Sequence, residues 1–74
     1  MEEFELKAEY ITLGQFLKVQ NYVSSGAEVK IQIEKLAVLV NGQSEFRRGK
    51  KLRAGDIVSL NEQKFLIKPW KLEI

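Results

Sequence analysis

The absence of cysteine constrains this chain more than any other feature, because the chain has only 74 residues. A chain of this size buries only about 60% of the surface that its unfolded form exposes. Small proteins often compensate with disulfides or a thiolate zinc site, and neither is open to a chain without cysteine. Hydrophobic residues make up 45% of the sequence, which is enough for one modest core. We therefore expect a single domain over residues 1–74.

A first helix is predicted to begin after Thr12. The Thr12 hydroxyl and Gln15, three residues later, have the spacing of a capping box. Leu13, Phe16 and Leu17 then form one apolar face. These signals predict a helix over residues 13 to about 21.

The next stretch of sequence has two interpretations. Ser25 and Glu28 repeat the spacing of a capping box, which favours a second helix. Residues 29–34 alternate apolar and polar side chains and include branched residues, which favours a strand. The same apolar positions also fit one face of a helix, so periodicity leaves both structures open.

The remainder of the chain has the signals of β structure. Residues 38–40 followed by Asn41-Gly42 predict a strand that enters a tight hairpin. Turns at residues 54–56 and 61–63 bound a strand at 57–60 and precede another at 64–67. Pro69 is expected to stop that last strand or confine it to an edge. Residues 4–6 alternate and predict either a short strand or a frayed helical turn.

Basic residues are concentrated in one short segment, although the formal net charge is only +2. The five are Arg47, Arg48, Lys50, Lys51 and Arg53. Arginine can fork onto phosphate oxygens and lysine adds a mobile point charge, so the segment predicts phosphate recognition. Gly49 would either permit backbone torsions that a side chain forbids or simply make a turn. The alternative function is a solvated loop that keeps the chain soluble.

Catalysis is not expected from this composition. The chain has no histidine and no cysteine, which removes the commonest general base and the commonest metal ligands. We therefore expect no catalytic residue, metal, cofactor or small-molecule substrate. The longest wholly apolar run, residues 36–40, is far short of the roughly 20 residues of a membrane helix. Acidic residues stand where a secretory signal would be basic, so we expect a cytoplasmic protein without membrane contact.

Four segments occur in a familiar order: residues 13–18 (LGQFLK), 24–28 (SSGAE), 37–42 (AVLVNG) and 48–58 (RGKKLRAGDIV). This succession resembles the RNA-binding domain first known from bacterial small-subunit ribosomal protein four, the S-four domain. The small stand-alone YaaA type of firmicute bacteria is the most similar form. The resemblance covers about residues 11–60, with N- and C-terminal extensions on either side.

The resemblance implies a fold and a binding surface. The fold is α+β, the alpha-L motif, with two short N-terminal helices packed on a small antiparallel sheet. Residues 25 to about 35 would form the second helix, and both helices with the adjoining hairpin would make a concave basic surface for structured RNA. Thr12, Gln15 and Gly26 depart from the family, which often carries basic residues there, and Leu36 replaces a frequent glycine. These departures leave Lys18, Lys30 and Lys35 on the helices and place more of the expected binding on the basic segment.

We accordingly expect non-catalytic binding of structured RNA, either ribosomal RNA or a ribosomal particle, by a monomer that acts in ribosome assembly or maintenance. The expected RNA-binding residues are Arg47, Arg48, Lys50, Lys51, Arg53, Lys18, Lys30, Gln15 and Ser25. Phe46 could stack on an exposed base, although packing over the hairpin is favoured. The alternative functions are a protein–protein adaptor that retains the fold without RNA binding, and a duplex DNA binder.

Overall fold

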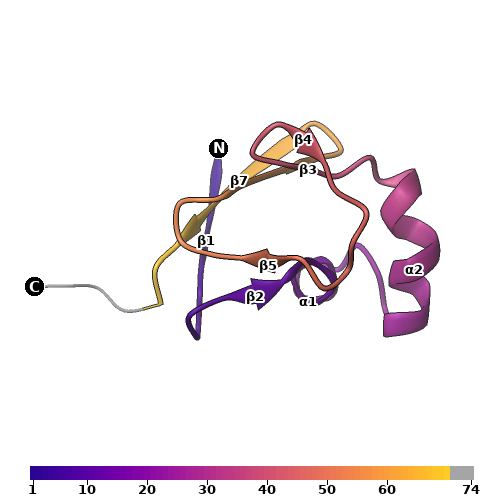
Figure 1. Cartoon of the computed structure of the whole chain (residues 1–74), viewed down its shortest axis with the longest axis horizontal. Coiled ribbons are helices and arrows are strands. Elements are labelled where there is room, and N and C mark those ends of the chain that lie inside the picture. The colour runs from indigo at the N-terminus through magenta and orange to yellow at the C-terminus, as the bar shows by residue number, and fades with distance from the viewer. Residues whose placement is uncertain (71–74) are drawn as a thin grey trace, which may run out of the picture.

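The described chain consists of short strands and two helices, and the second helix lies at one end of the molecule (Figure 1). The structure is a computed structural model that describes residues 1–70. Its elements are β1 (Glu2–Glu5), β2 (Ile11–Thr12), α1 (Leu13–Val19), α2 (Gly26–Lys35), β3 (Leu39–Val40), β4 (Gln43–Ser44), β5 (Lys51–Leu52), β6 (Ile57–Leu60) and β7 (Gln63–Lys68). Neither helix in this part of the chain is long and apolar enough to cross a membrane.

The capping box predicted at the start of α1 is confirmed. The Gln15 backbone N–H donates to Thr12 Oγ1 at 3.2 Å, and the Thr12 backbone N–H donates to Gln15 Oε1 at 3.1 Å. A cap of this kind contributes about 1 kcal/mol to helix stability. The helix ends at Val19, earlier than predicted, and Asn21 then takes a left-handed φ of 66° that turns the chain away.

The helix that the resemblance implied for residues 25–35 is confirmed as α2. Its buried residues are Val29 and Ile33, four positions apart on one helical face, whereas Ile31 between them is 62% exposed. Ser25 Oγ accepts from the Glu28 backbone N–H at 3.3 Å. The Glu28 carboxylate accepts from the Ser24 backbone N–H and hydroxyl, and these bonds hold the pKa of Glu28 below its ordinary value.

Five of the described strands form one mixed sheet in the order β1-β7-β6-β3-β4, and β2 pairs separately with β5. The α+β class is confirmed, but the expectation of an antiparallel sheet is wrong for one pair. β1 runs parallel to β7, with Glu2 opposite Phe65 and Glu5 opposite Lys68. Two strands also precede the helices. Alternation in a short segment predicts a strand but carries no information about its direction, because the partner is distant in the sequence.

Two tight turns shape the antiparallel part of the sheet. The predicted Asn41-Gly42 turn joins β3 to β4, with φ values of 54° and 84°. The turn between β6 and β7 uses Asn61 and Glu62 at φ values of 50° and 65°. Both turns have the left-handed conformation at two successive residues that tight hairpins favour. β7 ends at Lys68, directly before the proline that was expected to stop it.

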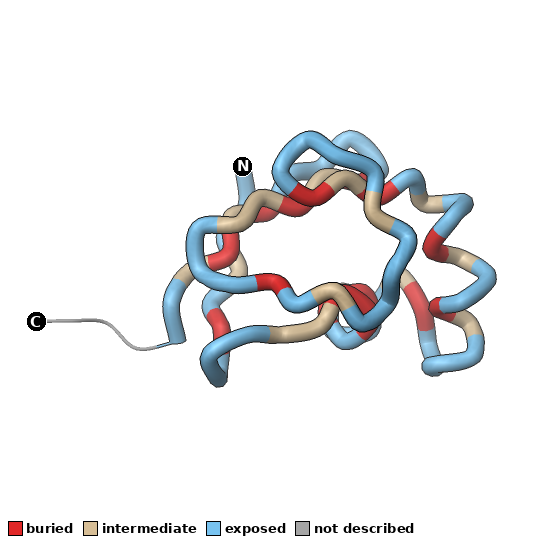
Figure 2. The backbone as a smooth tube through the Cα atoms, viewed as in Figure 1, coloured by how far each residue is buried: buried red, intermediate tan, exposed pale blue. Residues whose placement is uncertain are grey.

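The core joins the helices to the sheet (Figure 2). Phe16 of α1 is fully buried, and the Phe4 and Phe65 rings each meet it edge-on at a centroid distance of 5.2 Å. A fully buried phenylalanine contributes about 1.5–3 kcal/mol through the surface it removes from water. This row of three rings holds β1, α1 and β7 together, and so fixes α1 relative to the sheet.

Candidate nucleic-acid interface

The first half of the basic segment is a turn that is bound to the start of α1. The Lys50 backbone N–H donates to the Arg47 carbonyl at 3.1 Å, which closes the turn. The Leu13 N–H donates to the Lys50 carbonyl at 2.8 Å, and the Gly14 N–H donates to the Arg48 carbonyl at 2.9 Å. The first N–H groups of a helix lack partners within the helix, and here the turn supplies them. The backbone that carries Arg48 is thereby fixed.

Gly14 allows this close approach. A Cβ atom at position 14 would lie 3.3 Å from the Arg48 carbonyl oxygen and 3.4 Å from the Arg48 Cβ, which is tighter than ordinary contact. Gly49 has a different role from the one its torsional freedom suggested. Its φ is not in the left-handed region and a Cβ there would meet open space, so its role within the fold is that of a turn residue.

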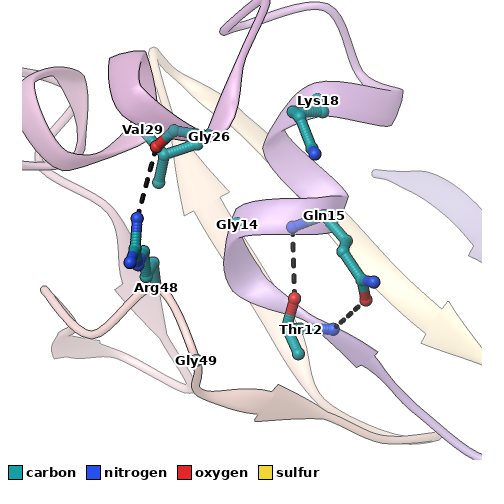
Figure 3. A pocket seen from close by; sticks show the side chains of 8 residues that line it. All are labelled: Thr12, Gly14, Gln15, Lys18, Gly26, Val29, Arg48 and Gly49. Atoms are coloured by element: carbon teal, nitrogen blue, oxygen red, sulfur yellow. Dashed lines mark hydrogen bonds between the residues drawn. The ribbon is translucent and has the colours of Figure 1, made fainter.

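A hollow of about 250 Å³ lies where the starts of both helices meet this turn (Figure 3). We call it the helix-start hollow. It is lined by Thr12, Gly14, Gln15, Lys18, Gly26, Val29, Arg48 and Gly49. Arg48 stands on one side, where its Nη1 donates to the Gly26 carbonyl at 3.4 Å, and Gln15 and Lys18 stand on the other. Two cationic side chains thus flank a cavity whose walls are mostly backbone and small residues.

A second hollow of about 290 Å³ adjoins the first at Arg48. We call it the Phe46 hollow, and its lining residues are Lys30, Ile33, Glu34, Phe46 and Arg48. Phe46 is 56% exposed, so more than half of its surface remains open to solvent. Arg48 lines both hollows, and we consider the two hollows together as one surface. We call this surface, with Gln15, Lys18, Lys30, Phe46 and Arg48 around it, the Arg48 face.

Arg47 lines neither hollow and is bound to Glu45. Its Nε donates to Glu45 Oε2 at 2.9 Å, its Nη2 to Oε1 at 3.2 Å, and its backbone N–H to Oε2 at 3.0 Å. These bonds and the positive charge of Arg47 lower the pKa of Glu45 to about 2 and raise that of Arg47. The ion pair with Glu45 partly cancels the charge of Arg47, which the sequence analysis had predicted to bind RNA.

The second half of the basic segment is a strand rather than a loop. β5 pairs with β2, with Lys51 opposite Thr12 and Leu52 opposite Ile11. Leu52 is fully buried, so the alternation of a strand directs Lys51 and Arg53 outward. Both lie over the Tyr10 ring, at 4.9 Å from Lys51 Nζ and 5.3 Å from Arg53 Cζ to the ring centroid. We call these three residues the Tyr10 patch.

The expected binding residues are therefore divided among several environments. Arg48, Lys18, Lys30 and Gln15 come together on the Arg48 face, while Lys51 and Arg53 belong to the Tyr10 patch. Lys50 is half-buried and lines neither hollow. Gln15 and Ser25 each use a side-chain oxygen in a helix cap, which leaves their donor groups for a ligand.

Two residues of this region were missed by the sequence analysis. One is Glu45, which stands two positions before Arg47 in the sequence, a short separation that could have revealed the pair. The other is Tyr10, for which the sequence gave no comparable signal. Lys51 and Arg53 lie over its ring only because β2 pairs with β5.

The arrangement is suited to holding an anion rather than a metal. Guanidinium, ammonium and amide groups supply donors, and arginine and lysine form strong charge-assisted hydrogen bonds with phosphate. Among residues 1–70, no three or more acidic side chains gather into a set of metal ligands. The fold and the Arg48 face thus define a class, that of a small α+β domain that presents a cationic, hollowed surface.

Comparison with known proteins identifies the family within this class. A model of the S4 domain, the S-four domain, matches residues 4–68, a wider span than the segments that first suggested it. The chain belongs to the S4 domain family. It is also 44% identical over 55 residues to a protein of Bacillus subtilis (strain 168) described as a probable ribosome maturation protein, RlbA. That alignment covers 74% of this chain and 78% of the relative.

Proposed function

We propose that this protein binds structured RNA through the Arg48 face, without catalysing a reaction, and that the RNA is ribosomal RNA in a maturing particle. The observation that carries the proposal is the position of Arg48, which is anchored on the starts of both helices and shared by two adjacent hollows. Family membership supports RNA as the ligand, and the name of the Bacillus relative supports the ribosomal setting.

The chemistry of the face favours recognition of shape over recognition of sequence. Lys18, Lys30 and Arg48 are cations on a surface whose backbone is held rigidly by the turn and the helix caps. Contacts of this kind neutralise phosphates and fix the orientation of a nucleic acid, but they do not read base pairs. Double-stranded RNA is recognised mostly by its shape, so a stem or a junction is the expected target.

A pair of charge-reversal variants tests the face. Replacement of Lys18 and Arg48 by glutamate is expected to weaken binding to an RNA hairpin at least about tenfold, through lost phosphate contacts and added repulsion. In the matched control, Lys7 and Lys64 are replaced by glutamate, which changes the total charge equally. Both are exposed lysines that line neither hollow. Fluorescence anisotropy with a labelled hairpin gives both affinities. An equal loss in the two variants would show that binding follows net charge and not this face.

Association with ribosomal particles requires a separate experiment. The protein is expected to sediment with ribosomal fractions in a sucrose gradient at low salt and to leave them at high salt. Crosslinking should then recover ribosomal RNA, and recovery should fall in the variant changed at Lys18 and Arg48. Particle binding that persists in this variant would favour the protein–protein adaptor instead. Equal affinity for a DNA hairpin of the same sequence would favour a duplex DNA binder.

A further inference from the structure

We infer that the Phe46 hollow receives a single unpaired guanine of the bound RNA, and that Phe46 and Glu34 recognise it. The inference rests on the proposed function and names what the second half of the Arg48 face would contact. The lining residues are those of a base site: an aromatic ring, an aliphatic side chain, a carboxylate and two cations.

Glu34 argues against a phosphate in this hollow. A carboxylate and a phosphate are both anions, and like charges held close together repel. A phosphate would suit the helix-start hollow, where the cations Lys18 and Arg48 are accompanied by glycines and amide groups and by no carboxylate. The Phe46 hollow therefore adjoins a phosphate site, the helix-start hollow, but is itself unsuited to a second phosphate.

Phe46 supplies a surface on which a flat base can rest. Phe46 lies in the chain just before the bound turn, is 56% exposed and borders the hollow. Ile33 also lines the hollow but is almost completely buried, at 3% exposure, so it holds α2 in place and offers little surface to a ligand. Unpaired bases of RNA stack on aromatic side chains, and such contacts are insensitive to the identity of the base. Stacking thus accounts for a base in the hollow, and the polar groups must select which one.

The polar groups fit guanine best. The Watson–Crick edge of guanine carries two adjacent donors, N1–H and the 2-amino group, which match the two oxygens of the Glu34 carboxylate. Its O6 and N7 atoms are acceptors, and arginine or lysine binds them in the commonest specific contact to guanine. Arg48 and Lys30 line the same hollow as Glu34. Adenine, cytosine and uracil each lack the pair of adjacent donors.

The shared position of Arg48 sets where this guanine lies in the RNA. The same side chain borders the helix-start hollow, where we place a phosphate, and the Phe46 hollow, where we place a base. On a stem, a nucleotide with its phosphate in the first hollow and its base in the second has that base turned out of the helix while its backbone continues along the stem. The expected ligand is thus a stem with a bulged or looped-out guanosine.

Five RNA hairpins with the same stem test the inference. One is uninterrupted, and each of the others carries a single bulged G, A, C or U. The wild-type protein is expected to bind the G bulge roughly fivefold to a hundredfold more tightly than the uninterrupted stem. The variants Phe46→Ala and Phe46→Leu should lose this gain, because neither side chain has a ring face; leucine does keep the apolar bulk. Both variants should still bind the stem. Phe46→Tyr should retain the gain.

A carboxylate variant separates stacking from selection. Glu34→Gln is expected to keep the preference for bulged over uninterrupted stems but to bind the four bulges with affinities within about threefold of one another. Glu62→Gln, in an exposed turn away from the hollow, makes the same change of charge and should leave the preference for G intact. Circular dichroism of each variant establishes that it is folded.

The outcomes distinguish this inference from the function on which it rests. Wild-type protein that binds every hairpin equally, with Phe46→Ala unchanged, would overturn the base site and leave structured-RNA binding in place. Wild-type protein that binds none of the hairpins and no ribosomal RNA would overturn both. A preference for bulges that survives in Phe46→Leu would show that apolar packing and not stacking receives the nucleotide, and would also overturn the inference.

Discussion

At the scale of single residues, Glu45 determines how much of the basic segment is available to a ligand. Its side chain is 12% exposed, and it forks onto Arg47, whose side chain is 74% exposed. A carboxylate in this position imitates the bidentate contact that a phosphate would make. RNA can therefore make the bidentate contact with Nε and Nη2 of Arg47 only by displacing Glu45.

Replacement of Glu45 by glutamine is expected to strengthen RNA binding. The change removes the negative charge that holds Arg47, so affinity should rise roughly twofold to fivefold, in keeping with the modest strength of exposed ion pairs. Anisotropy titrations of wild type and Glu45→Gln at one salt concentration measure the change. Glu62→Gln is the control for charge alone, and an equal gain in that variant would contradict a specific effect of Glu45.

The same carboxylate makes stability dependent on pH in the acid range. The pKa of Glu45 is lowered from 4.5 to about 2 in the folded chain. The folded state therefore binds this proton less readily than the unfolded state, so the stabilisation is fully present above pH 4.5 and is lost as pH falls toward about 2. We expect the melting temperature of the wild-type protein to exceed that of Glu45→Gln at neutral pH, and this difference to shrink toward about pH 2. Thermal melts followed by circular dichroism test this, and a difference that does not depend on pH would contradict it.

At the scale of elements, the two hairpin turns have the same conformation and different sequences. Asn41-Gly42 and Asn61-Glu62 each place two residues at positive φ. Glycine adopts this conformation without steric cost, whereas a residue with a Cβ is disfavoured by roughly 1–2 kcal/mol. The second turn is accordingly the more strained of the two.

Exchange of the glycine between these turns gives paired predictions. Glu62→Gly is expected to raise the free energy of unfolding by about 1 kcal/mol, because glycine relieves the left-handed strain. Gly42→Glu is expected to lower it by about the same amount for the converse reason. Urea unfolding monitored by tryptophan fluorescence or circular dichroism provides both values. A destabilised Glu62→Gly variant would show that the glutamate side chain contributes more than its backbone strain costs.

Local elements were predictable where their signals lie within a few residues. The Thr12–Gln15 capping box and the Asn41-Gly42 turn are examples, because hydrogen-bond geometry and positive φ depend on neighbouring residues. The second helix was ambiguous from its residues, since Val29 and Ile33 fit both a helical face and an alternating strand. The direction of β1 could not be predicted, because its partner β7 lies at the far end of the chain.

At the scale of the whole molecule, the division of the basic segment changes the expected salt dependence of binding. Contact with phosphates by Lys18 and Arg48 alone gives a slope of log affinity against log salt of about −1.8, at about −0.9 for each phosphate on a duplex. Contact by all five cations of the basic segment would give about −4.5. We expect the shallower value. Titrations over a range of salt concentrations measure the slope, and a value near the steeper limit would show that the Tyr10 patch also contacts phosphate.

The candidate site was predictable in its composition but not in its arrangement. Arg48, Lys18, Lys30 and Gln15 were all expected to bind, and the structure brings them onto one face. The separation of Lys51 and Arg53 could not be read from the sequence, because it results from the pairing of β5 with β2. Contacts between distant segments depend on tertiary packing, which local patterns do not encode.

The pairing of β1 with β7 has a consequence for how the protein is made. A chain leaves the ribosome from its N-terminus, so β1 is synthesised well before its partner β7, Gln63–Lys68. The sheet cannot be completed, and Phe4 and Phe65 cannot both close on Phe16, until nearly the whole described chain has emerged. During that interval β1 has no strand partner. Its three glutamates disfavour pairing with neighbouring nascent chains; they are Glu2, Glu3 and Glu5. Completion of the fold therefore has to follow the synthesis of β7.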